Sequence, residues 1–429
     1  MREITWRDGS GEHRAAWPSS SEPPAGPVGE VGDATRAADA VRRARAGEHL
    51  LYRGDWNNAR QLLAAMARRI AAARPPLTGS LAARWRAHRR WRREDHAVLS
   101  RLLVPVAPDL GLPLRRAPDL RAALAPLFED GPCGGLPALL PLREALGAVG
   151  AAEWRRRGVP VPALRGRVHP HHGVFAPVRG DYVALLAAEL DARGPGALAG
   201  RTAFDLGTGT GVLAILLARH GARVTATDLS PRAVACAREN AARLGVGDLV
   251  AVACADLFPQ GRADLVVANP PWLPGEPETP LDRAVYDAPA GAQGGAEAPG
   301  GGFLERFVAG LGDHLAPGGE GWLVLSDLAE ILGLRPAGEV ERLAALAGLE
   351  VAGRRTARAS HPRARDPADP LHEARARETV TLYRLRASPA PAGARPPETA
   401  IIAGGGGSGS IRRTTSSTGR RGVGRIVPP

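Results

Sequence analysis

The chain has 429 residues, of which 44% are apolar, so it is long enough for two domains and can bury a sizeable core. All 56 basic residues are arginine, which is typical of a GC-rich coding sequence, so the formal net charge of +12 supports a nucleic-acid partner only weakly. The cysteines are too widely spaced for a disulfide framework or a zinc site, and we expect neither a secretory signal nor a membrane span, because no apolar run approaches ~20 residues.

The composition of the sequence changes along the chain. Residues 1–34 are rich in Ser, Pro, Gly and Glu without periodic apolar positions, which predicts a disordered tail. Residues 35–165 have apolar stripes at helical spacing and no strand-like alternation, so they are predicted to form an all-α N-terminal domain that contributes to substrate recognition. Residues 388–429 combine Pro, a Gly-Gly-Gly-Gly-Ser run and several arginines, which is typical of a flexible tail.

Between residues 166 and 387, short apolar β runs alternate with helical stretches. The expected strands are 203–206, 223–227, 249–253, 264–268, 322–326 and 378–385, and the expected helices are 212–219, 231–244 and 303–315. Strands separated by helices predict an α/β fold with a doubly wound, Rossmann-like parallel sheet.

A glycine-rich turn follows the first of these strands, with the sequence Asp205-Leu206-Gly207-Thr208-Gly209-Thr210-Gly211. Alternate glycines let the backbone turn sharply and bring a ligand against main-chain amides. A dinucleotide fingerprint would need a third glycine at the position of Val212, so a nicotinamide oxidoreductase is disfavoured. The preceding acid, Asp205, suits a ligand that carries an ammonium group better than it suits a pyrophosphate. The alternative is a strand–helix turn without a ligand.

Acidic residues also follow the next two strands. Asp228 can accept hydrogen bonds from both hydroxyls of a ribose, although it could instead cap the next helix, as could Ser230. Asp256 can accept from an adenine amino group, with Leu257 against the ring. In this order, each just past a strand end, these residues predict one adenosine-binding crevice.

The motif Asn269-Pro270-Pro271-Trp272 follows the fourth strand. The prolines remove amide donors, so the Asn269 side-chain oxygen and the Pro270 carbonyl can hold both hydrogens of an NH2 group. This arrangement would turn the nitrogen lone pair toward a sulfonium methyl group, and Trp272 would offer a flat face to a planar amide or base. The alternative is a proline turn that ends in a core tryptophan.

These motifs resemble those of the class I S-adenosylmethionine-dependent methyltransferases related to the release-factor glutamine methyltransferases. That group also contains small-domain ribosomal RNA guanine-N2 enzymes and adenine-N6 enzymes. The resemblance rests on the glycine-rich turn, Asp228, Asp256-Leu257 and the NPPW motif, and it covers roughly residues 166–387.

The resemblance implies a seven-stranded sheet with an antiparallel last strand and S-adenosyl-L-methionine as cofactor. It also implies an acceptor amide or amino group held by Asn269, Pro270 and Trp272. The residues expected at the cofactor are Asp205, Gly207, Thr208, Gly209, Gly211, Asp228, Asp256 and Leu257. The glutamine enzymes usually have tyrosine at the position of Trp272, so the acceptor stays open between a protein glutamine and a nucleobase.

An arginine-rich stretch in the N-terminal part, residues 84–93, interleaves arginines with Trp85 and Trp91. It could grip RNA through phosphate contacts and stacking. The favoured alternative is a solvated helix whose tryptophans face the core.

We therefore expect a cytoplasmic N-methyltransferase that acts on a macromolecule connected with translation, either protein or RNA, without metal or membrane contacts. A catalytically inactive RNA-binding protein with a methyltransferase fold is the alternative. The intact Asp205, Asp228 and Asn269 argue against it, because an inactive protein need not retain all of them.

Overall fold

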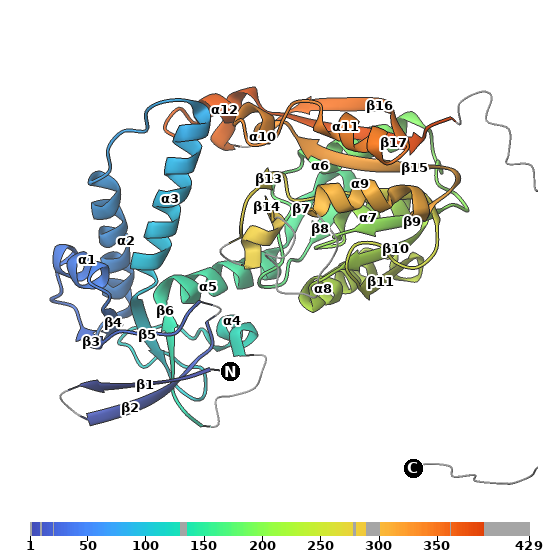
Figure 1. Ribbon diagram of the computed structural model, residues 1–429. Helices are drawn as coiled ribbons and strands as arrows, with labels where there is room; N and C mark the ends of the chain where they lie inside the picture. The colour runs from blue at the N-terminus through green and yellow to red at the C-terminus, as the bar shows by residue number, and fades with distance from the viewer. Residues whose placement is uncertain are drawn as a thin grey trace, which may run out of the picture. The chain divides into compact units, whose positions relative to one another are not determined.

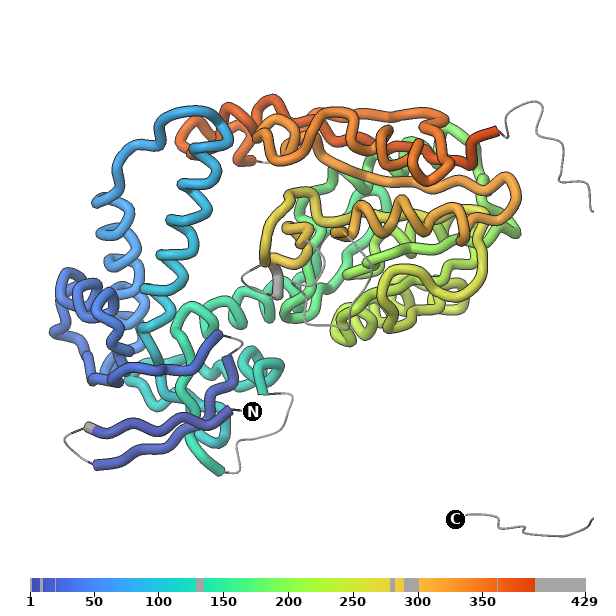
Figure 2. Tube along the Cα trace, viewed as in Figure 1, coloured from blue at the N-terminus to red at the C-terminus, as the bar shows by residue number. Residues whose placement is uncertain are grey.

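The structure is a computed structural model that describes residues 2–8, 11–19, 21–128, 135–277, 280–288, 301–360 and 362–389. Within residues 1–388, two successive parts of the chain each build a large mixed sheet with helices packed on it (Figures 1 and 2). No helix in these ranges is long and apolar enough to cross a membrane.

The N-terminal part contains a six-stranded sheet in the order β1-β2-β6-β5-β4-β3. Its strands are β1 (Arg2–Asp8), β2 (Gly11–Trp17), β3 (Val28–Val31), β4 (His49–Tyr52), β5 (Leu102–Val106) and β6 (Ala138–Pro141). The main helices are α1 (Ala37–Arg45), α2 (Trp56–Ala72), α3 (Leu81–Leu99) and α5 (Leu142–Arg157), and shorter pieces are α4 (Arg121–Leu124) and η1 (Ala125–Phe128).

Two predictions for this part are wrong. Residues 35–165 are not all-helical, and residues 1–34 are not a disordered tail, because they supply β1, β2 and β3 to the sheet. The strands β4, β5 and β6 are short apolar runs buried on both faces, and such runs cannot be told from buried helix segments by periodicity. In the first 34 residues, Trp17 is only 2% exposed and packs in a core that joins the hairpin of β1 and β2 to Leu51, Leu103 and Leu139 of the later strands.

The second part contains a seven-stranded sheet in the order β11-β10-β9-β12-β15-β17-β16. Its strands are β9 (Thr202–Leu206), β10 (Arg223–Asp228), β11 (Val250–Cys254), β12 (Ala263–Ala268), β15 (Leu315–Ser326), β16 (Leu349–Arg358) and β17 (Thr379–Ala387). The strands from β11 to β15 in this order are parallel, and β17 runs antiparallel to both of its neighbours. The doubly wound α/β sheet expected from the sequence is therefore present.

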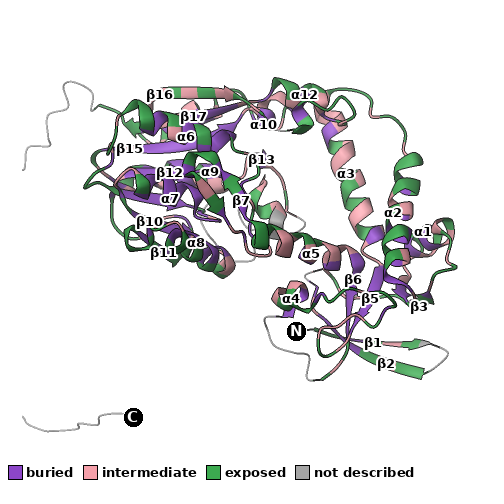
Figure 3. Cartoon of the chain, turned by 180° about the vertical axis from the view of Figure 1, so that it is seen from behind, coloured by how far each residue is buried: buried purple, intermediate pink, exposed green. Residues whose placement is uncertain are grey.

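Helices cover both faces of this sheet. One buried core joins the sheet to α6 (Asp181–Ala192), α7 (Val212–Arg219) and α8 (Pro231–Arg243), and another joins it to α9 (Phe303–His314) and α11 (Glu339–Leu346). Strands β12 and β15 are accordingly buried over most of their length (Figure 3). Alternate residues of β12 enter the two cores: Leu265 and Val267 pack in the first, Val266 and Ala268 in the second.

Shorter elements complete this part. They are β7 (Val159–Val161), η2 (Pro162–Leu164), β8 (Gly166–Val168), η3 (Gly247–Leu249), β13 (Leu273–Pro274), η4 (Pro280–Ala284), β14 (Tyr286–Asp287), α10 (Leu328–Ile331), η5 (Pro362–Ala364) and α12 (His372–Arg377).

The strand order reverses beside β9, since β10 lies on one side of it and β12 on the other. In open α/β sheets, ligands bind at such a switch point, outside the carboxyl ends of the strands. The glycine-rich turn follows β9, Asp228 ends β10, and Asn269 follows β12, so the predicted site residues gather at this edge of the sheet.

Candidate active site

Asp205 lies near the end of β9 with its carboxylate turned into the glycine-rich turn. Its Oδ2 accepts hydrogen bonds from the Thr208 hydroxyl at 2.6 Å and from the Ala214 backbone amide at 3.0 Å. Burial raises the pKa of Asp205 to about 6, and in the described part of the chain no cationic side chain pairs with it. A buried carboxylate without a cation is a feature that the ammonium group of a ligand would complete.

The glycines of the turn adopt conformations that other residues avoid. Gly207, Gly209 and Gly211 have φ values of +68°, +55° and +80°. At Gly211, which directly precedes α7, a Cβ atom would lie 3.1 Å from Cα of Ala237, so glycine also permits the close approach of α7 to α8. The sequence pattern of the turn thus has a local structural cause.

Asp228 connects the glycine-rich turn to the start of α8. Its Oδ2 accepts from the Gly209 amide at 2.9 Å, and its Oδ1 accepts from the Ser230 amide at 2.9 Å. Helix capping falls to Ser230, whose hydroxyl accepts from the Ala233 amide at 3.4 Å. Burial raises the pKa of Asp228. Each carboxylate oxygen keeps a second lone pair, so both remain able to accept from a ribose hydroxyl.

Asp256 and Leu257 follow β11, beside the end of β10. The Asp256 carboxylate forms an ion pair with Arg306 of α9, with Nη2 to Oδ2 at 2.6 Å, and the sequence did not suggest this partner. Leu257 has a φ of +64° and is buried in the second core, where its carbonyl accepts from the Thr227 hydroxyl at 2.5 Å. The predicted contacts of these residues with adenine stay predictions.

The Asn269–Trp272 turn follows β12. The Trp272 indole Nε1 donates a hydrogen bond to Asn269 Oδ1 at 3.0 Å. Because the indole nitrogen is only a donor, the oxygen of the Asn269 amide must face the tryptophan. Pro270 is buried, and Trp272 is half-buried against both cores of the sheet.

One face of Trp272 is covered by the side chain of Arg179, a contact that the sequence did not suggest. Cζ of Arg179, which lies just before α6, is 4.7 Å from the centroid of the Trp272 ring. Arg179 is separated from Trp272 by more than ninety residues in the sequence, so no local pattern connects the two. An acceptor would therefore have only the other face of Trp272 available for stacking.

A further aromatic ring lies against the glycine-rich turn. A Cβ atom at Gly207 would lie 3.4 Å from the Phe303 ring, at the start of α9. Asp287 fixes that helix start, since its carboxylate accepts from the Phe303 amide at 2.5 Å and from the Leu304 amide at 3.2 Å. The segment after the Asn269–Trp272 turn, which we call the acceptor turn after its predicted role, is thereby tied to α9 beside the expected cofactor site.

Helix α3 of the N-terminal part reaches the same segment. Trp85 is only 9% exposed and packs with Leu273 and neighbouring apolar side chains of the second part. Cζ of Arg89 lies 3.8 Å from the centroid of the Tyr286 ring, and its Nη2 donates to the Glu276 carbonyl at 2.8 Å. Trp85 therefore faces a core, as the favoured alternative for residues 84–93 predicts. These contacts also place α3 beside the strands β13 and β14 that follow the acceptor turn.

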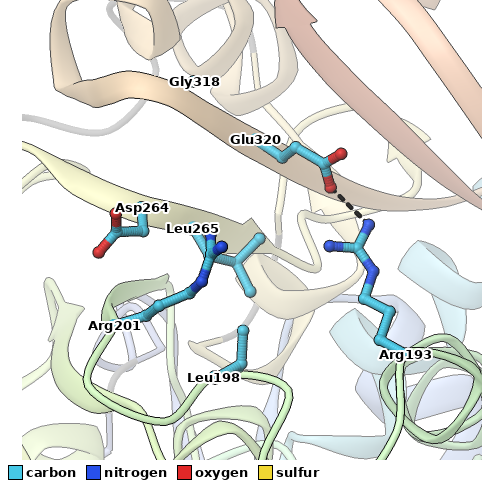
Figure 4. Close-up of a pocket in the computed structure, with 7 residues that line it drawn as sticks. All are labelled: Arg193, Leu198, Arg201, Asp264, Leu265, Gly318 and Glu320. Carbon is cyan, nitrogen blue, oxygen red and sulfur yellow. Dashed lines mark hydrogen bonds and ion pairs between the residues drawn. The ribbon is translucent and has the colours of Figure 1, made fainter.

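A pocket elsewhere in the sheet is separate from these residues (Figure 4). Asp264, Leu265 and Gly318 line it from near the amino ends of β12 and β15, and Arg201 lies just before β9. On its wall, the Arg193 guanidinium pairs with Glu320 at 2.6 Å. Because the predicted site residues gather at the carboxyl ends of the strands, this pocket lies at the opposite end of the sheet.

Comparison with known proteins places the second part of the chain in a family. The profile of the methyltransferase small domain matches residues 165–287. Over 203 residues the chain is 32% identical to a release factor glutamine methyltransferase from Gloeobacter violaceus, covering 43% of this chain and 68% of that protein.

Two further relatives are matched over shorter stretches. A release factor glutamine methyltransferase from Cereibacter sphaeroides is 38% identical over 148 residues, which cover 33% of this chain and 51% of that protein. A ribosomal protein L11 methyltransferase from Pelotomaculum thermopropionicum is 52% identical over 73 residues, covering 16% of this chain and 24% of that protein. The chain thus spans about half the length of the Cereibacter relative. It belongs to the S-adenosylmethionine-dependent methyltransferases, in the family that includes the release factor glutamine methyltransferases.

Proposed function

We propose that the protein transfers a methyl group from S-adenosylmethionine to a planar amide or amino nitrogen of a macromolecule, with a protein glutamine as the leading acceptor. The observation that carries this proposal is the adjacency of two features at one edge of the sheet. Asp205, a buried carboxylate without a cationic partner among the described residues, lies near the end of β9. The Asn269–Trp272 turn follows the neighbouring strand β12.

The residues around the glycine-rich turn fit the cofactor. Asp205 would hold its ammonium group, Gly207, Thr208, Gly209 and Gly211 would bring the backbone against it, and Asp228 would accept from the ribose hydroxyls. Asp256 and Leu257 would face the adenine, in which case the Arg306 pair orients the Asp256 carboxylate. When bound, the cofactor supplies an electrophilic methyl group on a sulfonium centre. Holding it beside the acceptor nitrogen makes the reaction effectively unimolecular.

The acceptor turn would orient the nitrogen. The Pro270 carbonyl and the second lone pair of Asn269 Oδ1 accept the hydrogens of the NH2 group, which leaves the nitrogen lone pair facing the methyl group. The amide plane would stack on the face of Trp272 that Arg179 does not cover. No strong base is needed, because the nitrogen becomes acidic once it is alkylated and its proton can pass to water.

The names of the relatives favour a protein acceptor over a nucleobase, since they describe enzymes of release factors and of ribosomal protein L11. We therefore place the protein in the cytoplasm, with a translation protein as its partner. RNA remains the alternative acceptor, and a tryptophan at position 272 can stack on a base as well as on an amide.

The experiment is methyl transfer from radiolabelled S-adenosylmethionine to a cell extract, followed by separate treatment with protease and with RNase. We expect protein-bound label that protease releases and RNase does not. Complete enzymatic digestion should yield the label as N5-methylglutamine, and acid hydrolysis, which cleaves the side-chain amide, should release it as methylamine. Label released by RNase would show that the acceptor is a nucleobase and not a protein glutamine. No transfer to either fraction, with intact cofactor binding, would contradict the proposed activity.

A further inference from the structure

Helix α6 is flanked by two arginines, and each of them stacks on a tryptophan of the sheet region. Arg179, before the helix, lies over Trp272, with Cζ 4.7 Å from the ring centroid. Arg193, directly after the helix, lies over Trp322 of β15 at 4.6 Å. The first pair touches the acceptor turn, whereas the second borders the pocket at the opposite end of the sheet (Figure 4).

The Arg179 guanidinium is held in place by two buried carboxylates. Its Nη1 donates to Glu378 at 3.0 Å and its Nη2 donates to Asp181 at 3.2 Å, and the two acidic side chains are only 1% and 5% exposed. The same Glu378 oxygen accepts from the Ser326 hydroxyl at 2.6 Å. The guanidinium plane is therefore anchored to the ends of β15 and β17 and to the first turn of α6.

The Nε–H of Arg179 is the donor that these two ion pairs do not use. Arg179 Nε is buried and makes no hydrogen bond in the described structure. The side chain thus keeps its guanidinium carbon over the indole although one of its donors has no partner. A flat cation over a tryptophan face is attracted by the ring electrons, more so when both are shielded from water.

From this geometry we infer that Arg179 is a positioning residue for methyl transfer, an inference that rests on the proposed function. The guanidinium fixes the plane of the Trp272 ring, and the indole nitrogen then holds Asn269 Oδ1 in the orientation that receives the acceptor. Arg179 also closes one face of the ring, so the acceptor stacks only on the other. Arg179 itself touches neither the acceptor nor the cofactor in this arrangement.

Lysine is the informative replacement. It keeps the positive charge beside Asp181 and Glu378, but an ammonium group cannot bridge both carboxylates in one plane or lie flat on an indole. Arg179→Lys therefore keeps the positive charge and removes the planar group that covers the indole. The matched control is Arg193→Lys, because Arg193 also lies over a tryptophan and pairs with two carboxylates, the buried Glu189 at 3.4 Å and the partly buried Glu320 at 2.6 Å, away from the acceptor turn.

The first measurement needs no acceptor. The full chain is labelled with 5-fluorotryptophan, and the 19F resonances of Trp272 and Trp322 are assigned by replacing each with phenylalanine. We expect Arg179→Lys to shift and broaden the Trp272 resonance alone, and Arg193→Lys to affect only that of Trp322. An unchanged Trp272 resonance in Arg179→Lys would overturn the inference, even if methyl transfer by the wild-type protein had not been detected.

The second measurement is methyl transfer to the labelled fraction of the extract, with cofactor binding followed by calorimetry. We expect Arg179→Lys to lower kcat ~10- to 100-fold, the size of effect that a small misplacement of a reacting group produces. The cofactor Kd should stay within about twofold, and Arg193→Lys should keep the wild-type kcat. A moved Trp272 ring with wild-type kcat would overturn the inference and leave the proposed function standing.

A purely structural role would give a different pattern, in which kcat follows thermal stability across the variants. Glu378→Gln provides the test if Arg179→Lys folds poorly, because it keeps the size of the side chain and loosens Arg179 without removing it. We expect Glu378→Gln to broaden the Trp272 resonance and lower kcat by less than Arg179→Lys does. Loss of kcat in Glu378→Gln without any change at Trp272 would also overturn the inference.

Discussion

The indole nitrogen of Trp272 donates to Oδ1 of Asn269 at 3.0 Å, so the first and last residues of the acceptor turn hold one another in place. The bond crosses the two prolines between them, which themselves restrict the backbone. Asn269 Oδ1 is consequently a preorganised acceptor with one lone pair in use and one free. Preorganisation of this kind is what separates binding an acceptor from orienting it for reaction.

Asn269→Ala is expected to abolish methyl transfer while leaving cofactor binding nearly intact. The change removes the oxygen that orients the acceptor and also leaves the Trp272 indole without its partner. A misplacement of ~1 Å can cost ~100-fold in rate. Single-turnover transfer at saturating cofactor measures the loss, and calorimetry measures the cofactor Kd. Near-normal turnover would make the turn a structural feature only.

Asp228→Ala is expected to weaken S-adenosylmethionine binding by ~1–3 kcal/mol, the cost of leaving a buried polar partner unpaired. The carboxylate also accepts from the Gly209 and Ser230 amides, so part of the loss would come from a looser glycine-rich turn. Calorimetry gives the affinity. The control is Asp248→Ala, an exposed acid in the same part of the chain, for which wild-type affinity is expected. Equal affinity in Asp228→Ala would contradict the ribose assignment.

Cofactor affinity should fall as the pH drops below 6. Burial raises the pKa of Asp205 from 3.8 to about 6, so the free protein holds a proton on this carboxyl at low pH. That proton favours the fold below pH ~4, and its contribution is lost as the pH rises through about 6. Binding of the ammonium group needs the ionised form, and the ammonium itself stays charged below pH ~7.

The measurement is calorimetry of S-adenosylmethionine binding between pH 5 and 7. Wild-type Kd should rise on acidification by up to ~10-fold per pH unit below the pKa. Asp205→Asn should bind weakly with no such dependence in this range. The assignment of Asp205 to the ammonium group fails if the two proteins share one pH profile.

Local patterns in the sequence were sufficient for the part of the fold that holds the candidate site. Strands β9, β10 and β12 are apolar runs that end in a glycine turn, an aspartate and an asparagine–proline pair, so both the strand and its end are marked. Strand β16 carries no such mark. It is a sheet edge with two exposed arginines, Arg354 and Arg358, and only its pairing with β17 makes it a strand.

The partners of the site residues were beyond the reach of local patterns. Arg179 meets Trp272 and Arg306 meets Asp256 only because helices and strands distant in the sequence pack together. The N-terminal sheet was missed because β4, β5 and β6 are short apolar runs that read equally well as buried helix segments, and only their pairing with one another and with their neighbours makes them strands. Sequence spacing indicates which residue types could carry the chemistry, and the tertiary packing decides what restrains them.

Removal of residues 1–34 should destabilise the protein strongly, in contrast to what their composition suggests. These residues form β1, β2 and β3 and bury large side chains such as Trp17. Each large apolar side chain contributes ~1.5–3 kcal/mol when buried, so a loss of ~10 °C or more in Tm is expected. Calorimetric melting of the shortened protein and of the full chain provides the comparison. Equal Tm values would mean that the hairpin of β1 and β2 and its neighbour β3 add nothing to the core.

Arg89→Ala should loosen the strands β13 and β14 and weaken acceptor methylation without changing cofactor affinity. Arg89 donates to the Glu276 carbonyl at 2.8 Å and covers the Tyr286 ring at 3.8 Å, so it holds this segment to α3 from the N-terminal part. A partly shielded cation–π contact of this kind contributes ~0.5–2 kcal/mol. Local opening of β13 and β14 should therefore become up to ~30-fold more frequent, which hydrogen exchange of the Leu273 and Gly275 amides would detect.

The matched control for this prediction is Arg86→Ala on the same helix. Arg86 is exposed and lies one turn before Arg89 on α3, about 60° around the helix axis from it. Hydrogen exchange in β13 and β14 and the acceptor KM should stay at wild-type values in Arg86→Ala, whereas Arg89→Ala should raise both. Equal effects of the two changes would indicate that the positive charge of α3, and not its contact with Tyr286, acts on the acceptor. Such a result would favour an RNA-containing substrate, because phosphate contacts depend on charge more than on the position of a single arginine.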